Sequence, residues 1–290
     1  MTEYFDSYMD PNVHRLMLKD APRVEAYKRA LEACKGRIEN GVVVDVGSGT
    51  GFLAILAATL GAKVVVAIEA SEMAGVITSV ARENGVEDRV LVFAGNADDY
   101  GITMHLELEP KPRLVRGPAQ TKDVDVVVSE WMGFHLLHES MLDTVISLRK
   151  RLLKPDGLML PSSAKVWSAL VDAQEYIDQE VTWCHNVGGV SMSCLDPLFR
   201  STIPNPLVHQ FDWKNVSFNT PLQLAELDLT TIEIEDLEVI SEEVTYRVHQ
   251  PSQSGLAHGV LIWFEVGFPD SVSLSTSPSA HPTHWKQSMP

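Results

Sequence analysis

Residues 42–58 read Val-Val-Val-Asp-Val-Gly-Ser-Gly-Thr-Gly-Phe-Leu-Ala-Ile-Leu-Ala-Ala and decide the fold. The valine-rich start predicts a buried strand, the glycines at 47, 49 and 51 a tight turn, and the apolar run after them a helix. Glycine permits positive φ and close backbone approach, and the first amides of the helix point at whatever lies in front of them. This strand, loop and helix predict a site for a nucleotide-like ligand.

The spacing of these glycines leaves three interpretations of the loop open. A dinucleotide fingerprint, G-x-G-x-x-G, would place its third glycine where Phe52 stands, so the match to NAD binding is imperfect. Asp45 and the shorter G-x-G-x-G pattern resemble the first motif of S-adenosylmethionine-dependent methyltransferases. The third interpretation is a glycine turn that only packs the helix on the strand.

Composition bounds the class of protein. The chain has 290 residues, 45% of them hydrophobic, and a net charge of -16, which indicates an ordered globular protein. This charge disfavours direct binding to nucleic acid or an anionic membrane and attracts basic partners. Cys34, Cys184 and Cys194 form no C-x-x-C pair, so we expect neither a disulfide framework nor a metal site. We also expect no signal peptide and no membrane span.

Periodicity divides the chain into three segments. Residues 1–38 are expected to be helical, with Asp20 as an N-cap, Pro22 in the first turn and Gly36 as the stop. Residues 39–161 alternate strands and helices, and residues 162–290 are rich in short strand-like runs. The expected elements are strands at 42–46, 63–69, 89–94, 124–129, 237–240, 244–248 and 260–268, an insertion loop at 101–123 and a helix at 137–153.

Two acidic residues follow the second and third strands. Glu69 ends the second strand, where a carboxylate can accept both hydroxyls of a ribose, a group that NAD and S-adenosylmethionine share. Asp98 lies just past the third strand, where it would face the adenine or else be a solvated loop acid.

A second pair of acids, Glu130 and Glu139, follows the fourth strand and is expected to carry the chemistry. Glu139 follows Glu130 by nine positions, and side chains at this spacing point in different directions on both a helix and a strand. They can meet only if the chain reverses between them, and Gly133 offers the reversal point. Two carboxylates brought together repel unless a cation lies between them. The pair therefore predicts a clamp for a guanidinium, whose planar geometry suits two carboxylates. Taken separately, Glu139 would be an ordinary first-turn helix acid and Glu130 a loop acid.

Four motifs along the chain resemble the protein arginine N-methyltransferase family and occur in its order. They are Tyr4-Phe5-Asp6-Ser7-Tyr8, Asp45-Val46-Gly47-Ser48-Gly49-Thr50-Gly51, the run from Ser129-Glu130-Trp131-Met132-Gly133 to Glu139-Ser140-Met141-Leu142, and Thr283-His284-Trp285. The resemblance covers almost the whole chain. It implies an α/β fold, in which a doubly wound, Rossmann-like domain binding S-adenosylmethionine is followed by a β-barrel-like domain with a helical dimerisation arm.

The resemblance also implies roles for individual residues. For the cofactor these are Arg23 at its carboxylate, Glu69 at its ribose, Gly47 at its methionine end, His14 alongside, and Tyr8, Asp45, Gly49 and Asp98 nearby. Asp98 stands where relatives have Glu. The implied catalytic residues are Glu130 and Glu139, with His284 paired to Asp20 to assist proton removal, and the implied substrate pocket contains Met17, Met141 and Trp131.

The family's properties extend this expectation to products and partners. By resemblance the chain makes mono- and asymmetric dimethylarginine (type I) on basic proteins such as histone tails or Gly-Arg-rich segments, in the nucleus or cytoplasm. Residues of about 173–205 match the arm through which members form homodimers. The family's barrel continues well beyond Thr-His-Trp, so either a late segment is missing from this chain or its barrel is closed differently. A catalytically impaired member that only binds cofactor or dimerises is therefore an alternative.

Two further classes are disfavoured. Nucleic-acid amino-methyltransferases on the same cofactor fold need a group such as N-P-P-Y after the fourth strand to stack the target base, and this chain has Ser-Glu-Trp-Met there. A NAD-dependent oxidoreductase is disfavoured by Phe52 and by the lack of a hydride-site constellation.

Overall fold

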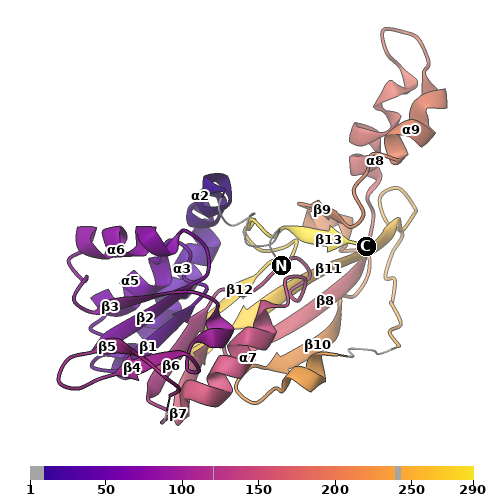
Figure 1. Ribbon diagram of the computed structural model, residues 1–290. Coiled ribbons are helices and arrows are strands. Elements are labelled where there is room, and N and C mark those ends of the chain that lie inside the picture. The colour runs from indigo at the N-terminus through magenta and orange to yellow at the C-terminus, as the bar shows by residue number, and fades with distance from the viewer. Residues whose placement is uncertain (1–9, 120, 239–242) are drawn as a thin grey trace.

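The computed structural model describes residues 10–119, 121–238 and 243–290, in which two sheets lie next to each other and a helical arm projects from the second (Figure 1). The first sheet has five parallel strands in the order β3-β2-β1-β6-β7. They are β1 (Val42–Val46), β2 (Val64–Glu69), β3 (Val90–Ala94), β6 (Val124–Ser129) and β7 (Leu153–Leu160). The strand order reverses beside β1, and a ligand crevice is expected at the carboxyl ends there.

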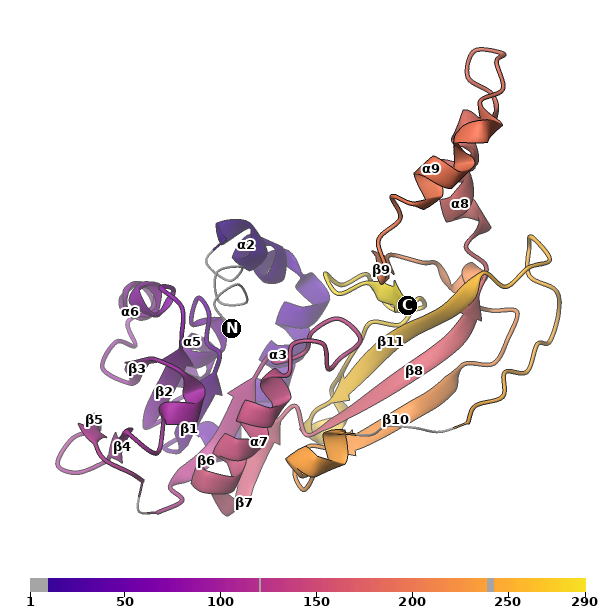
Figure 2. The same cartoon turned by 45° about the vertical axis from the view of Figure 1, so that its right-hand side comes forward.

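Helices cover both faces of this sheet, which explains why its central strands are continuous runs of apolar residues. All residues of β1 and β2 are buried. The helices of this half are α2 (Pro11–Lys19), which packs on α3, and then α3 (Ala21–Ala33), α4 (Lys35–Ile38), α5 (Phe52–Thr59), α6 (Ala74–Glu83) and α7 (Met141–Leu152), with the 3-10 turn η1 (Ala97–Asp99) after β3. Figure 2 shows α3 and α5 on the opposite side of the sheet from α7.

Three expectations for this half were wrong in detail. Gly36 does not stop a helix but lies inside α4, because α3 already ends at Ala33. The expected insertion loop contains a hairpin of β4 (Met104–Glu107) and β5 (Arg113–Arg116), whose short polar strands have no strong apolar period. The helix expected at 137–153 begins only at Met141, because the backbone of Ser140 is left-handed.

The second sheet is antiparallel, in the order β10-β8-β11-β13-β9, and β12 pairs with the far end of β11. Its strands are β8 (Ser163–Val171), β9 (Leu207–His209), β10 (Leu222–Asp228), β11 (Gly259–Gly267), β12 (Ser273–Ser275) and β13 (Gln287–Met289). The 3-10 turns η4 (Trp213–Asn215), η5 (Ile234–Leu237) and η6 (Pro269–Ser271) connect them. The fold class predicted from the sequence, a Rossmann-like parallel sheet with a separate antiparallel β domain, is confirmed.

The strand expected at 237–240 falls partly outside the described residues, and the strand expected at 244–248 was not found. Leu237 belongs to η5, and residues 239–242 lie outside the described residues. Residues 244–248 run beside another loop and form a single bridge, from Val248 to Asn219. Tyr246 reaches the second sheet, where its hydroxyl bonds Ser168 Oγ of β8 at 2.8 Å, whereas Val248 is 56% exposed.

The arm follows β8 and consists of short helical pieces that rise away from both sheets (Figure 1). They are α8 (Gln174–Glu180), η2 (Thr182–His185), η3 (Ser193–Leu195) and α9 (Asp196–Arg200). Several of its large apolar side chains are exposed, namely Trp183, Val187, Val190, Met192 and Leu198. Among the helices of the described ranges, none combines the length and the apolar character needed to cross a bilayer.

A buried arginine joins the two sheets. Arg149 of α7 donates to the carbonyl oxygens of Leu229 at 2.7 Å and Ile232 at 2.5 Å, both on the segment after β10. The hydrogen-bonded guanidinium thus satisfies two carbonyl groups at the domain boundary.

We expect Arg149→Met to lower the free energy of unfolding by about 3 kcal/mol, because it removes both donors from a buried site. Lys150→Met is the matched control, since Lys150 is exposed and only pairs with Glu233 at the surface, an interaction worth at most about 1 kcal/mol. Urea unfolding measures both. Equal losses in the two variants would contradict this role of Arg149.

Candidate active site

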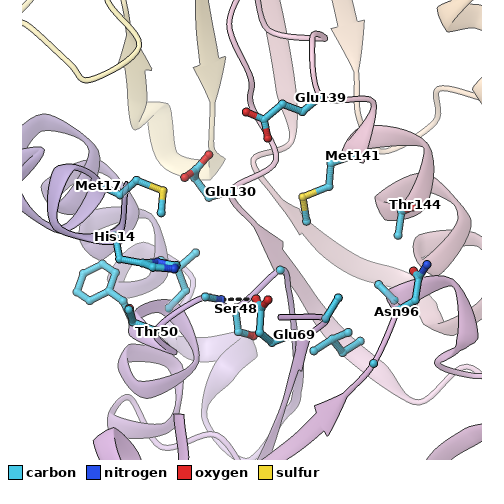
Figure 3. Close-up of a pocket in the computed structure, with 18 of the residues that line it drawn as sticks. His14, Met17, Ser48, Thr50, Glu69, Asn96, Glu130, Glu139, Met141 and Thr144 are labelled. Carbon is cyan, nitrogen blue, oxygen red and sulfur yellow. Dashed lines mark hydrogen bonds between the residues drawn. The ribbon is translucent and has the colours of Figure 1, made fainter. Parts of the chain in front are cut away.

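A cavity of about 520 Å³ opens at the carboxyl ends of β1, β2 and β6, with α2 at its side (Figure 3). Its lining comprises His14, Met17, Leu18, Arg23, Gly47, Ser48, Gly49, Thr50, Phe52, Leu53, Ile68, Glu69, Ala70, Gly95, Asn96, Ala97, Asp98, Glu130, His138, Glu139, Ser140, Met141 and Thr144. The cavity lies at the reversal of strand order, where an open α/β sheet binds its ligand.

The glycine loop forms the floor of the cavity. The Gly49 amide donates to Glu69 Oε2 at 2.7 Å, and the Ser71 amide donates to Oε1 at 2.8 Å. Both oxygens of Glu69 are thereby oriented at the tip of β2, inside the cavity (Figure 3). Gly47 has a φ of 71°, a left-handed backbone conformation that residues with a Cβ rarely adopt, which favours glycine at this position.

Asp45 supports this loop from behind and does not line the cavity. Its Oδ2 accepts from the Ala54 amide at 3.0 Å, which fixes the first turn of α5. Burial raises the pKa of Asp45 to about 7, although this hydrogen bond opposes the shift. Asp45, predicted among the cofactor-binding residues, therefore acts by positioning the glycine loop.

Arg23 and Glu130 form a nearly buried ion pair at the edge of the cavity, which the sequence did not predict. Arg23 Nε donates to Glu130 Oε2 at 3.0 Å, and Nη1 donates to the Met17 carbonyl at 3.3 Å. Each side chain is 9% exposed. Tyr27 fixes the end of β6 by donating to the Ser129 carbonyl at 2.9 Å. This network holds the Glu130 carboxylate in place before any substrate arrives.

The chain reverses between the two glutamates, as their spacing requires. Gly133 and Leu136 exchange backbone hydrogen bonds of 3.0 and 3.1 Å, and His135 and Leu136 have positive φ. A Cβ at Gly133 would come within 2.7 Å of Glu139 Cγ, so this position must be glycine for the hairpin to close. Figure 3 shows the carboxylates of Glu130 and Glu139 turned into the same part of the cavity.

Asp20 and His284 lie next to the cavity lining rather than in it. Asp20 Oδ1 caps α3 by accepting from the Arg23 amide at 3.0 Å, and Oδ2 accepts from the His284 amide and from its Nδ1, at 2.8 and 2.6 Å. Burial alone would raise the pKa of Asp20, but the hydrogen bonds from His284 and from the Arg23 amide, together with the charge of His284, outweigh it and hold this pKa below its ordinary value. Trp285, whose ring lies 3.9 Å from that of His284, donates to the Met132 carbonyl. The pair thus ties the β domain to the helix that carries Arg23.

We expect Asp20→Asn to lower the free energy of unfolding at pH 7 by about 2 kcal/mol, because an amide cannot accept all three N–H groups. The native pKa of Asp20 lies below the unfolded value of about 3.9. The stability that the Asp20 carboxylate contributes is therefore fully present above the unfolded pKa and is lost as pH falls through the native pKa. Urea unfolding from pH 7 to pH 3 should show the two proteins converging. A difference independent of pH would contradict this account.

The remaining predicted residues divide into three groups. Met17, Met141, His14, Gly49 and Asp98 line the cavity. Trp131 is buried, lies outside the lining, and its Nε1 has no hydrogen-bond partner among the described residues. Tyr8 lies outside the described residues.

Sequence reasoning assigned no role to six polar lining residues, namely Ser48, Thr50, Asn96, His138, Ser140 and Thr144. His138 immediately precedes Glu139, so its place in the hairpin was a signal. Asn96 follows the end of β3 and Thr144 lies in the first turn of α7, and neither belongs to a recognisable motif.

The donor set of the cavity fits S-adenosylmethionine. A cavity of about 520 Å³ accommodates a nucleoside joined to an amino acid. Glu69 offers two oriented oxygens for ribose hydroxyls, and Arg23 is the one Lys or Arg among the described lining residues, suited to a carboxylate. Its guanidinium has five N–H donors, more than its bonds to Glu130 and Met17 use.

Two family models match the chain, and they meet where the first sheet ends and the second begins. Residues 27–162 match the family model of ribosomal protein L11 methyltransferase, and residues 162–289 match the model of the arginine methyltransferase oligomerization subdomain.

Relatives and solved structures match both halves together. Protein arginine N-methyltransferase 6 of Xenopus tropicalis is 37% identical over 298 residues, which cover 99% of this chain and 80% of that protein. A probable protein arginine N-methyltransferase 6.1 of Oryza sativa subsp. indica is 35% identical, covering 99% and 77%. The crystal structure of PRMT6 with SAH superposes with a TM-score of 0.76 at 28% identity, covering 97% of this chain and 87% of that one. The Trypanosoma brucei PRMT1 enzyme-prozyme heterotetrameric complex with AdoHcy gives a TM-score of 0.77 at 29% identity, covering 97% and 82%. The chain therefore belongs to the protein arginine N-methyltransferase family.

Proposed function

We propose that this chain is an active type I enzyme, which transfers methyl groups from S-adenosylmethionine to arginine side chains of basic proteins and forms asymmetric dimethylarginine. Its family membership makes it an S-adenosylmethionine-dependent protein arginine methyltransferase. The observation that carries the proposal of activity is the convergence of Glu130 and Glu139 in one cavity with Arg23 and the glycine loop.

The two glutamates hold and orient the substrate. S-adenosylmethionine supplies an electrophilic methyl group when it is bound. A guanidinium is a poor nucleophile because its lone pairs are delocalised and its pKa exceeds about 12. Hydrogen bonds from two of its nitrogens to Glu130 and Glu139 draw positive charge toward those nitrogens and leave the third aimed at the methyl. That nitrogen gains the methyl group and loses one proton to solvent, and S-adenosylhomocysteine is the leaving group. Arg23 keeps the Glu130 carboxylate in position through its 3.0 Å bond.

The type I product is supported by two methionines beside the glutamates. Met17 comes from α2 and Met141 from the start of α7, and both line the cavity beside the glutamates (Figure 3). Both are unbranched, flexible side chains that can adapt to a substrate that already carries one methyl group.

Oligomerisation is supported by the family model over 162–289, and we propose a homodimer formed through the arm. The exposed side chains of Trp183 and Leu198 give the arm an apolar surface of the kind that interfaces bury. A net charge of -16 fits basic substrates such as histone tails or Gly-Arg-rich segments.

Methyl transfer to a Gly-Arg-rich peptide and to a histone-tail peptide, followed by product analysis by mass and chromatography, tests the proposal. The matched control is each peptide with Lys in place of Arg. We expect asymmetric dimethylarginine from the arginine peptides only. Symmetric dimethylarginine would overturn the type I assignment, and no transfer to either peptide would favour the catalytically impaired alternative.

A further inference from the structure

The arm brings together three side chains that suit a transition metal, at a place remote from the cavity lining. They are Cys184 and His185 at the end of η2 and Asp196 at the start of α9. One possible ligand atom from each, a sulfur, a ring nitrogen and a carboxylate oxygen, lies within 4.8 Å of the others. We propose that these residues bind a divalent transition metal ion, with Zn²⁺ as the natural occupant.

The distances between the donor atoms support this assignment. Tetrahedral Zn²⁺ binds sulfur at about 2.3 Å and nitrogen or oxygen at about 2.0–2.2 Å, so neighbouring ligand atoms lie roughly 3.3–3.8 Å apart. Cys184 Sγ lies 3.6 Å from Asp196 Oδ1, inside that interval. His185 Nε2 lies 2.8 Å from the same oxygen, so this ion pair must open by roughly 0.5 Å to admit the metal. His185 is exposed, which allows that movement.

The chemistry of the three donors also favours zinc over a hard cation. A thiolate, an imidazole and a carboxylate are borderline to soft ligands, whereas Mg²⁺ and Ca²⁺ prefer sites made of oxygen alone. On binding, the Cys184 thiol would release its proton to solvent and the sulfur would bond to the metal. Water completes the fourth position of this three-residue site.

The backbone around the cluster is built to hold it. Met192 donates its amide to the Cys184 carbonyl at 3.0 Å, and Cys184 Sγ donates to the Met192 carbonyl at 3.5 Å. The segment between Cys184 and Met192 closes through a backbone bridge from Val187 to Val190. The proposed metal would therefore clamp the base of this loop and order the tip of the arm, where several apolar side chains are exposed. This inference does not depend on catalysis.

Metal titration of the full chain tests the proposal. The protein is dialysed against a chelator, kept reduced so that Cys184 and Cys194 remain thiols, and titrated with Zn²⁺ or with Co²⁺ as a spectroscopic probe. We expect one metal per chain, a thiolate-to-cobalt charge-transfer band and the visible absorption of tetrahedral Co²⁺.

Variants assign the ligands. His185→Asn and Asp196→Asn should each weaken Zn²⁺ binding at least about tenfold, and Cys184→Ser should abolish the charge-transfer band. Asp178→Asn is the matched control, because Asp178 lies on the same arm but bonds to Gln174 and Thr182 instead. His185 is exposed, so its variant keeps the test valid if the Cys184 variant fails to fold. No metal binding by the reduced protein, or binding unchanged in His185→Asn and Asp196→Asn, would overturn the proposal.

Discussion

Glu139→Gln should reduce the rate of methyl transfer about 10³-fold while leaving the affinity for cofactor nearly unchanged. The substitution keeps the size of the side chain and removes its negative charge. That charge is needed where the substrate guanidinium is held, and loss of one such electrostatic contact in an enclosed site costs about 3–4 kcal/mol of transition-state stabilisation. Glu139 lies at the hairpin end of the cavity, whereas Glu69, held by the glycine loop, marks the ribose end.

Asp143→Asn is the control for this experiment. Asp143 lies in the first turn of α7, four residues after Glu139, and is not part of the cavity lining. Initial rates with labelled S-adenosylmethionine and an arginine peptide, together with calorimetric binding of S-adenosylhomocysteine, separate catalysis from binding. Equal rates in the Glu139 and Asp143 variants would refute the assigned role. A loss of cofactor affinity as large as the loss of rate would place Glu139 at the cofactor end of the cavity instead of the substrate end.

Arg23→Met should weaken binding of S-adenosylhomocysteine by about 30–100-fold, because it removes the cation suited to the ligand's carboxylate. Truncating one partner of a largely buried charge pair costs about 2–5 kcal/mol, and here Glu130 also loses its partner at 3.0 Å. Because Glu130 loses this partner, we also expect kcat for methyl transfer to fall. Arg23→Lys should be intermediate, because lysine keeps the charge but loses the planar fork that bonds Glu130 and Met17 together.

Arg29→Met is the matched control on the same helix, since Arg29 is exposed and does not line the cavity. Calorimetry measures the affinities, and urea unfolding shows whether the unpaired Glu130 destabilises the fold. If Arg23→Met bound S-adenosylhomocysteine within about twofold of Arg29→Met, the ligand's carboxylate would not lie at Arg23.

The parallel sheet could be predicted from sequence because its signals are local. Valine runs at 42–46 and 64–66, followed by glycines or an acid at the strand ends, specify both the elements and the edge where a ligand binds. The glutamate hairpin could be predicted because a spacing of nine residues cannot converge without a reversal, and Gly133 is the residue that permits one. The structure shows that the contact of Gly133 with Glu139 requires a glycine there.

The features that could not be predicted depend on tertiary contacts between ordinary residue types. Arg149 resembles a solvated helix arginine in sequence, yet it is buried against two carbonyl groups of a segment 80 residues away. Arg23 and Glu130 are 107 residues apart and only the fold pairs them. The cysteine-histidine-aspartate cluster of the arm was missed because Asp196 follows His185 by eleven residues, and only the loop between them brings the side chains together.

Binding of arginine and citrulline peptides tests most directly whether the two glutamates recognise a guanidinium. Citrulline has nearly the shape of arginine, but its neutral urea has an oxygen where the guanidinium has an NH2 group. The ratio of the two affinities, measured with S-adenosylhomocysteine present, therefore reports recognition of the guanidinium's charge and N–H donors together. We expect the native chain to prefer the arginine peptide by about 100-fold, and Glu139→Gln to reduce that preference to within about threefold. An equal preference in the native chain and the Glu139 variant would contradict the account.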